Sequence, residues 1–194
     1  MSEPVAEGRP ARDANRLGAL ALRLSDRIEV VVAVEGVRSP STASALSSIE
    51  RFFVDPPTID ELRRVLGLTS SGTVRLVDAL EHDGLVARGR GRDGRTSTVT
   101  LTSRGRAVSE QVVAARAVVL TEALGVLSAQ ERHRLAPLLD KLLTGLVEPR
   151  PSGPAMCRLC ATEACGADRG DPCPVVLIAL GAASREPGTV DPPG

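Results

Sequence analysis

Four cysteines are the residues whose type and spacing most directly suggest chemistry. They follow the pattern C-x2-C-x4-C-x7-C, as Cys157, Cys160, Cys165 and Cys173. Zinc in proteins takes four tetrahedral ligands, and a C-x2-C pair supplies two thiolates from one turn of chain. Clustered cysteines in a reducing compartment indicate metal or redox chemistry rather than structural disulfides. We therefore expect the four thiols to hold one structural zinc ion.

Three alternatives for the cysteines stay open. The last gap is longer than in a zinc knuckle, and an iron–sulfur cluster or a disulfide-based redox switch also uses thiolates. The third alternative is that the thiols share no site. If they respond to oxidants or metal, this segment is the sensing element of a redox- or metal-responsive interaction protein.

A dense group of arginines forms the second candidate site. Residues 86–106 contain six Arg and one Asp, in a chain whose 24 Lys+Arg balance 24 Asp+Glu. Asp93-Gly94 between two runs of β-branched residues is typical of a hairpin turn. Arginine at the tip of a hairpin fits the phosphate backbone of duplex DNA. The alternatives are a solvated hairpin and a surface for protein or RNA.

The periodicity of apolar residues predicts the elements that position this hairpin. The expected helices span residues 14–34, 39–53, 59–66, 70–83, 103–127 and 129–146, and the expected strands span 85–88 and 97–101. Capping boxes mark two helix starts, at Thr58/Glu61 and Ser128/Glu131. The third and fourth helices are separated by a tight turn with Gly67, which is the spacing of a helix-turn-helix.

The fourth helix has an inner apolar face and an outer polar face. Thr73, Leu76, Val77 and Leu80 face inward, and Ser70, Ser71, Val74, Arg75 and Asp78 face outward. Serine and arginine hydrogen-bond base edges or phosphates, and arginine is the commonest reader of guanine. Val74 fits a thymine methyl group, or else it is a partly buried helix residue. We expect Asp78 to orient Arg75, or another arginine, rather than to touch DNA.

The composition excludes several classes of protein. Hydrophobic residues make up 42% and aromatic residues 1%, with two Phe and neither Trp nor Tyr. A core of Leu, Val and Ala favours helices packed on helices, and single-strand platforms need rings on which bases stack. The sequence contains no nucleophile or acid–base motif of an enzyme. It also shows no apolar run of the roughly 20 residues that span a bilayer, so we expect a cytoplasmic protein without membrane contact.

Motifs in the fourth helix and the hairpin resemble those of the MarR family of bacterial transcription regulators. They are Leu76-Val77-Asp78-Ala79-Leu80-Glu81 with Gly84-Leu85-Val86, then Arg92-Asp93-Gly94-Arg95, then Leu101-Thr102-Ser103-Arg104-Gly105. In that family the wing reads Asp-x-Arg, followed by strand residues and Leu-Thr-x-x-Gly. The resemblance covers about residues 14–148. It implies a mainly α fold with a small β-hairpin wing (α+β), in which a winged helix-turn-helix sits on a helical dimerisation domain.

The resemblance also implies how the chain binds DNA. The fourth helix enters the major groove, Arg95 enters the minor groove or grips its phosphate walls, and Asp93 holds the Arg95 guanidinium. Arginines 88, 90 and 92 would contact phosphates, which position a protein without carrying sequence information. The expected DNA-binding set is Ser70, Ser71, Val74, Arg75, Arg88, Arg90, Arg92, Asp93 and Arg95.

A homodimer with this architecture requires double-stranded DNA with an inverted-repeat operator, its half-sites about one helical turn apart. Repression is the expected mode, and a small-molecule effector is left open. The expected organisation is a disordered tip (1–13), a MarR-like domain (14–148), a linker (149–156), a cysteine-rich metal-binding extension (157–183) and a disordered tail (184–194). Within the MarR-like domain, residues 14–53 and 103–148 form the dimerisation helices and 57–102 the winged helix-turn-helix.

Overall fold

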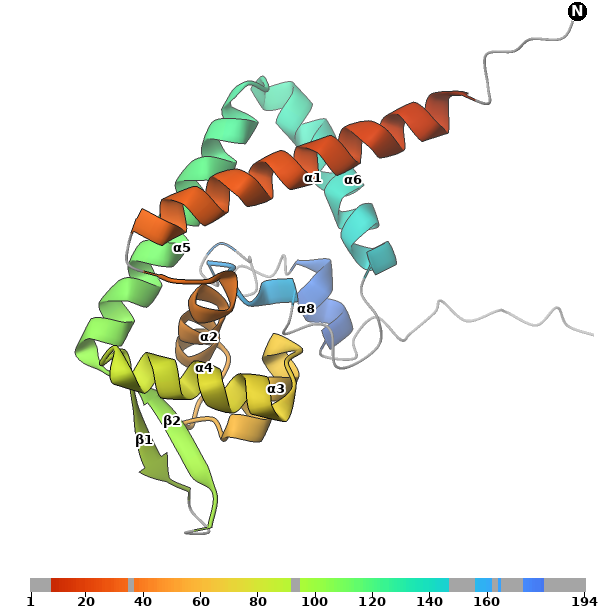
Figure 1. Ribbon diagram of the computed structural model, residues 1–194. Coiled ribbons are helices and arrows are strands. Elements are labelled where there is room, and N and C mark those ends of the chain that lie inside the picture. Colours follow the sequence, from red (N-terminus) through yellow and green to blue (C-terminus); the bar gives the residue numbers. More distant parts are fainter. Residues whose placement is uncertain are drawn as a thin grey trace, which may run out of the picture.

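The computed structural model describes residues 8–34, 37–91, 95–146, 156–161, 164 and 173–179. The described part is mainly helical with one two-stranded hairpin, which confirms the predicted fold class (Figure 1). In chain order the elements are α1 (Gly8–Val34), α2 (Pro40–Arg51), α3 (Ile59–Leu66), α4 (Ser70–His82), β1 (Val86–Arg90), β2 (Ser97–Leu101), α5 (Ser103–Gly125), α6 (Ala129–Leu146) and α8 (Pro174–Ala179).

Both predicted capping boxes are present. The Glu61 amide donates to Thr58 Oγ1 at 3.2 Å, and the Thr58 amide donates to the Glu61 carboxylate at 2.8 Å. Ser128 and Glu131 exchange the same pair of bonds at 3.3 and 2.8 Å. These bonds stabilise the ionised carboxylates, with the backbone N–H as the main cause, and hold the pKa of both glutamates below the ordinary value. The caps therefore fix where α3 and α6 begin.

The first helix is longer than predicted. It begins at Gly8, so residues 8–13 are helical and the prediction of a disordered tip is wrong for them; residues 1–7 lie outside the described part. Apolar periodicity could not detect this turn, because residues 8–13 contain no large apolar side chain. Proline is tolerated in a first helical turn, as at Pro10, and Asp13 pairs with Arg16 at 3.0 Å.

Helices α2–α4 and the hairpin, which we call the winged unit, have their own core. Side chains from α2, α3, α4 and the hairpin form one buried cluster that includes Leu46, Leu62, Leu80 and Val99, each at most 1% exposed. The hairpin is antiparallel, with Val86 opposite Leu101 and Arg90 opposite Ser97. Residue 57 adds a further bond to the sheet, because the Val99 amide donates to the Pro57 carbonyl at 2.9 Å. The cluster thus ties the hairpin to the helix-turn-helix.

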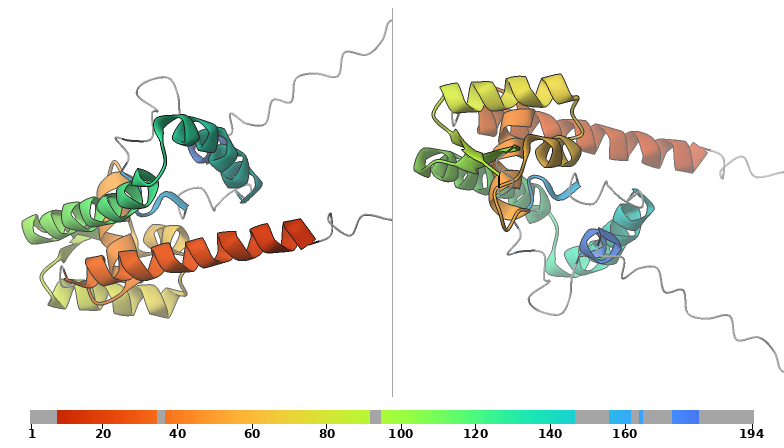
Figure 2. Two further views of the ribbon diagram at one scale, coloured as in Figure 1. Left: turned by 90° about the horizontal axis from the view of Figure 1, so that it is seen from above. Right: turned by 90° about the horizontal axis from the view of Figure 1, so that it is seen from below.

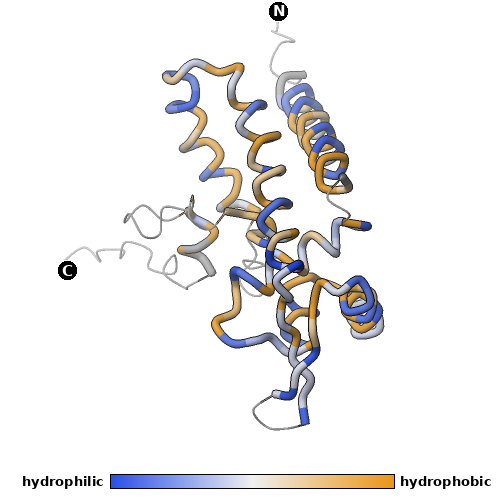
Figure 3. The backbone as a smooth tube through the Cα atoms, turned by 90° about the vertical axis from the view of Figure 1, so that its left-hand side faces the viewer, coloured by the Kyte–Doolittle hydropathy of each residue, from blue (hydrophilic) through white to orange (hydrophobic). Residues whose placement is uncertain are grey.

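A second, smaller cluster joins the winged unit to the long helices. Val32, Val37, Ala43 and Val112 are buried where α1, α2 and α5 meet. Beyond this junction α1 extends as a rod, and α5 and α6 form a bent arm (Figures 1 and 2). Figure 3 shows apolar segments along α1 and along both helices of the arm. The long helices therefore have faces that the single chain does not cover.

The last helices pack only lightly. Helix α6 (residues 129–146) contains no buried residue, and it packs against α8. The short α8 directly follows Cys173 and lies on the last long helix. The predicted linker (149–156), apart from residue 156, and the tail (184–194) lie outside the described residues. No single helix of the described ranges is long and apolar enough to cross a bilayer; α5 and α6 pass that test only as a pair bent by 118°.

Candidate nucleic-acid interface

Helix α4 is fixed by its cap and its buried face. Thr69 caps the helix, because its Oγ1 accepts from the Gly72 amide at 3.1 Å. Thr73 and Val77 are fully buried and Leu80 is 1% exposed, whereas Leu76 is half-buried against the same core. The Thr73 hydroxyl donates to the Thr69 carbonyl at 3.0 Å, which satisfies a polar group inside the core.

The opposite face of α4 is open to solvent. All five side chains predicted to point outward are exposed: Ser70, Ser71, Val74, Arg75 and Asp78. Val74 keeps 40% of its surface exposed, so it belongs to the outer face rather than to the core. The outer face therefore offers two hydroxyls, one guanidinium and one methyl-bearing side chain to a groove.

Gly72, which lowers helix propensity in the first turn of α4, has a local reason. A Cβ at this position would lie 3.0 Å from Thr69 Oγ1, the atom that caps the helix. Glycine at this position leaves the cap undisturbed, and it adds no side chain to the helix surface beside Ser71.

The root of the wing is held against α5. The Thr102 hydroxyl donates to the Gly84 carbonyl at 2.8 Å, and the Thr102 amide donates to the Leu85 carbonyl at 3.0 Å. Thr102 Oγ1 also accepts from the Gly105 amide at 3.0 Å, which caps α5. A Cβ on Gly105 would lie 1.9 Å from the Leu85 carbonyl oxygen. The threonine and the glycine of Leu-Thr-x-x-Gly thus allow the first turn of α5 to lie directly against the backbone of Leu85 at the base of the wing.

Arg88 joins the wing to α4. Its guanidinium pairs with the Asp78 carboxylate, and its Nε lies 3.5 Å from Glu81 Oε2. The Arg88 amide also donates to Glu81 Oε1 at 3.3 Å. Asp78 therefore orients Arg88, the other arginine that the prediction left open, rather than Arg75. Arg88 thus forms a clamp that fixes the wing relative to α4, and its predicted phosphate contact stays a prediction.

Other predicted wing residues have mixed outcomes. Arg90 and Arg95 are exposed on the two sides of the hairpin. Arg92 and Asp93 lie outside the described residues, so the predicted Asp93–Arg95 pairing stays a prediction. The described part of the wing thus presents two exposed arginines beside its turn.

Two arginines that the sequence reasoning missed hold the end of α4. Arg38 pairs with Asp83 at 3.1 Å, and Arg104 Nη1 donates to the Asp83 carbonyl at 3.1 Å. A cation at a helix C-terminus is favourable, because the last carbonyls carry partial negative charge. Arg38 lies 45 residues from Asp83 in the chain, so no local spacing could have revealed the pair.

The cysteine segment brings two of its four thiols together. Cys157 and Cys160 share one turn, in which the Cys160 amide donates to the Cys157 carbonyl at 2.8 Å. A hydrogen bond with Cys157, aided by the Arg116 guanidinium, lowers the pKa of the Cys160 thiol to about 6 despite partial burial. Cys173 directly precedes α8, and Cys165 lies outside the described residues. Among the described side chains, no three of His, Cys, Asp or Glu gather closely enough to hold a metal ion, so zinc stays a prediction.

Comparisons with known proteins agree with this geometry. No family model matches the chain. It is 29% identical over 86 residues to an uncharacterized HTH-type transcriptional regulator of Bacillus subtilis, YwhA, across 44% of this chain and 62% of that protein. The chain thus spans less than two thirds of the length of this curated relative.

The fold recurs in solved structures. A MarR family protein from Bacillus stearothermophilus is 25% identical with a TM-score of 0.64, over 74% of this chain and 99% of that one. YusO from Bacillus subtilis is 22% identical with a TM-score of 0.63, over 71% and 96%. A mutant of MepR from S. aureus, solved bound to an oligodeoxyribonucleotide, is 16% identical with a TM-score of 0.55, over 69% and 97%.

Together, the fold and the exposed face of α4 define a winged helix-turn-helix protein with a scaffold of long helices, α1, α5 and α6. More particularly, the chain has the fold of MarR-family transcriptional regulators, which confirms the resemblance predicted from its wing and recognition-helix motifs.

Proposed function

We propose that this protein is a sequence-specific regulator of transcription that binds double-stranded DNA. The observation that carries the proposal is the joint between α4 and the wing, where Arg88 bonds Asp78 and Glu81. It holds an open polar helix face and an arginine hairpin as one surface. A helix fits the major groove, and an adjacent arginine fits the phosphates or the minor groove.

Each element of this surface has a separate task. Arg75 would bond guanine in the major groove, with Ser70 and Ser71 on bases or phosphates and Val74 on a thymine methyl. Arg90 and Arg95 would contact the backbone or minor groove and add affinity for any sequence. Arg88 and Asp78 would position the wing and make no direct contact with bases.

The protein would act as a homodimer. On α1 and α6, large apolar side chains are exposed in the single chain, among them Leu17, Leu20, Leu138, Leu142 and Leu146. Two copies that share these faces would cover them, and a two-fold axis would relate the two α4 helices. The DNA site would then be an inverted repeat, with repression as the mode of regulation. The MepR mutant bound to an oligodeoxyribonucleotide supports DNA as the partner.

For the cysteine segment, structural zinc remains our proposal. The adjacent Cys157 and Cys160 thiols support a two-ligand knuckle, which Cys165 and Cys173 would complete. A second candidate function, redox or metal sensing by this segment, is favoured by the hydrogen bond between the same two thiols and by the Arg116 guanidinium beside them. The cytoplasmic location stays a prediction.

Selection of bound duplexes from a random library tests the proposed function. We expect enrichment of one inverted repeat, with affinity that falls steeply as salt rises because arginines displace counterions. Metal analysis of the same preparation should find one zinc per chain. Enrichment of no duplex sequence, or binding that is insensitive to salt, would contradict DNA-binding regulation.

A further inference from the structure

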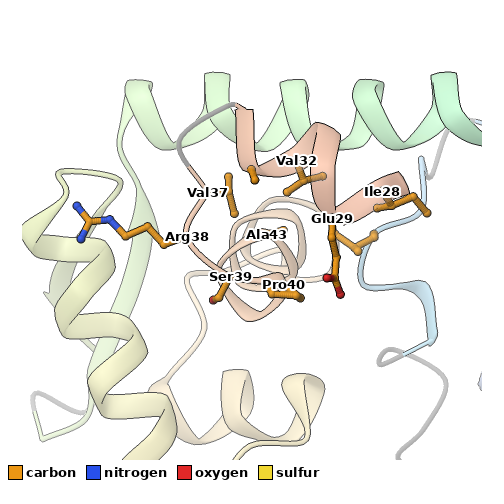
Figure 4. Close-up of a pocket in the computed structure, with 10 residues that line it drawn as sticks. Ile28, Glu29, Val32, Val37, Arg38, Ser39, Pro40 and Ala43 are labelled. Atoms are coloured by element: carbon orange, nitrogen blue, oxygen red, sulfur yellow. The ribbon is translucent and has the colours of Figure 1, made fainter. Parts of the chain in front are cut away.

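A segment next to the two adjacent cysteines packs on the junction of the long helices. Leu159 is half-buried and contacts the cluster of Val32, Val37, Ala43 and Val112. It also lines a recess of about 180 Å3 between α1 and α2. Figure 4 shows Ile28 and Val32 of α1 above Ala43 of α2 around this recess, with Arg38 turned away toward α4. Leu159 is part of the wall of this recess, and the cluster that it packs against is apolar.

The residue after Leu159 supplies a polar anchor. The Cys160 side chain hydrogen-bonds with Arg116, which lies on α5. Within the turn, the Cys160 amide donates to the Cys157 carbonyl at 2.8 Å. Leu159 and Cys160 together thus contact α1, α2 and α5, the three helices that meet at the junction.

Further along the chain, the same extension has a second attachment. In α8, Val175 is 3% exposed, and this helix packs against α6. The extension therefore touches the molecule at two places, the α1–α2–α5 junction and the α6 arm.

We infer that residues 156–161 form a strap, which seats Leu159 against the apolar junction of α1, α2 and α5 and fixes the angle between α1 and the winged unit. α1 lies outside the core of the winged unit, whereas α2 contributes buried side chains to it. A side chain wedged between them restricts how the winged unit moves on the scaffold. If two copies bind DNA as proposed above, the seat of Leu159 sets the spacing of their α4 helices and hence DNA affinity. Only this last step rests on the proposed function.

Hydrogen exchange of the full-length protein without DNA tests whether the strap is seated. In Leu159→Asp, a carboxylate packed against the apolar cluster of the junction is unfavourable. We expect amides of residues 28–33 and 112–116 to exchange about tenfold faster or more, with little change in α3 and α4. Leu159→Met keeps the volume and should exchange like the wild type. Val54→Asp is the charge-matched control, because Val54 is fully exposed in the α2–α3 loop.

Fluorescence anisotropy with the duplex selected above tests the consequence. Leu159→Asp should change DNA affinity by about tenfold or more, whereas Leu159→Met and Val54→Asp should bind like the wild type. Unchanged exchange in Leu159→Asp would overturn the strap. Faster exchange with unchanged DNA affinity would overturn its control of the recognition helices. If the wild type binds no duplex, the proposed function fails, whereas the exchange result still decides whether the strap is seated.

Discussion

The winged unit and the helical arm differ in how each satisfies its apolar residues. In the winged unit, Leu62 and Val77 are fully buried within one chain. In the arm, Leu138 is 57% and Leu146 70% exposed, although both units are rich in leucine. The winged unit therefore completes its own core, whereas the arm has a surface that a single chain leaves uncovered.

The largest expected effect comes from the core of the winged unit. Leu62→Ala should lower the free energy of unfolding by about 2–5 kcal/mol, because it leaves a cavity among α2, α3 and α4. Leu138→Ala on α6 is the matched control, and it should cost the isolated chain little. Chemical denaturation at a concentration where the protein is monomeric measures both. Equal losses in the two variants would refute the difference between the units.

The next largest effect concerns the joint between the wing and α5. Gly105→Ala places a methyl group against the Leu85 carbonyl oxygen, 1.9 Å from the ideal Cβ position. We expect a loss of about 1–3 kcal/mol in unfolding free energy. Gly125→Ala is the control, because its added Cβ meets no atom within 4 Å. Thermal unfolding of the two variants would expose an error if Gly105→Ala were as stable as Gly125→Ala.

Loss of the partner surface should change assembly rather than folding. Leu138→Glu puts a carboxylate on the exposed face of α6, where a second copy would have to bury it. We expect sedimentation at micromolar concentration to show a dimer for the wild type and a monomer for the variant, with circular dichroism unchanged. The dimer model is contradicted by a wild-type monomer that still binds the selected inverted repeat.

The smallest effect is the pH dependence of one helix cap. The Thr58 bonds lower the pKa of Glu61 in the folded chain below the ordinary value of 4.5. Glu61 therefore adds stability that is present above pH 4.5 and is lost as pH falls through the lowered value. Glu61→Gln keeps a capping box without the ionisation. Acid unfolding of this variant should depend less on pH below 4.5 than that of the wild type, and identical profiles would contradict the assignment.

The sequence predicted the local features of the fold better than its distant contacts. Caps such as Thr58 and Thr102 act within three residues, and the inner face of α4 follows from helical periodicity. An arginine partner for Asp78 was expected, but neither its identity as Arg88 nor the pair of Arg38 with Asp83 could be predicted, because chain topology, rather than spacing, brings these residues together. For the same reason, the part that Arg88 takes in the clamp was not predicted, and its contact with phosphate stays a prediction.

In the function proposed above, α4 reads bases while the wing adds affinity for any sequence. Binding of Arg75→Ala and Arg95→Ala to the selected duplex and to single-base variants of it tests this claim most directly. We expect Arg75→Ala to lose about 1–3 kcal/mol and to relax the preference at one base pair of each half-site. Arg95→Ala should weaken binding to every duplex and lower the salt dependence. Unchanged affinity in both variants at moderate salt would contradict the assignment of this surface to DNA.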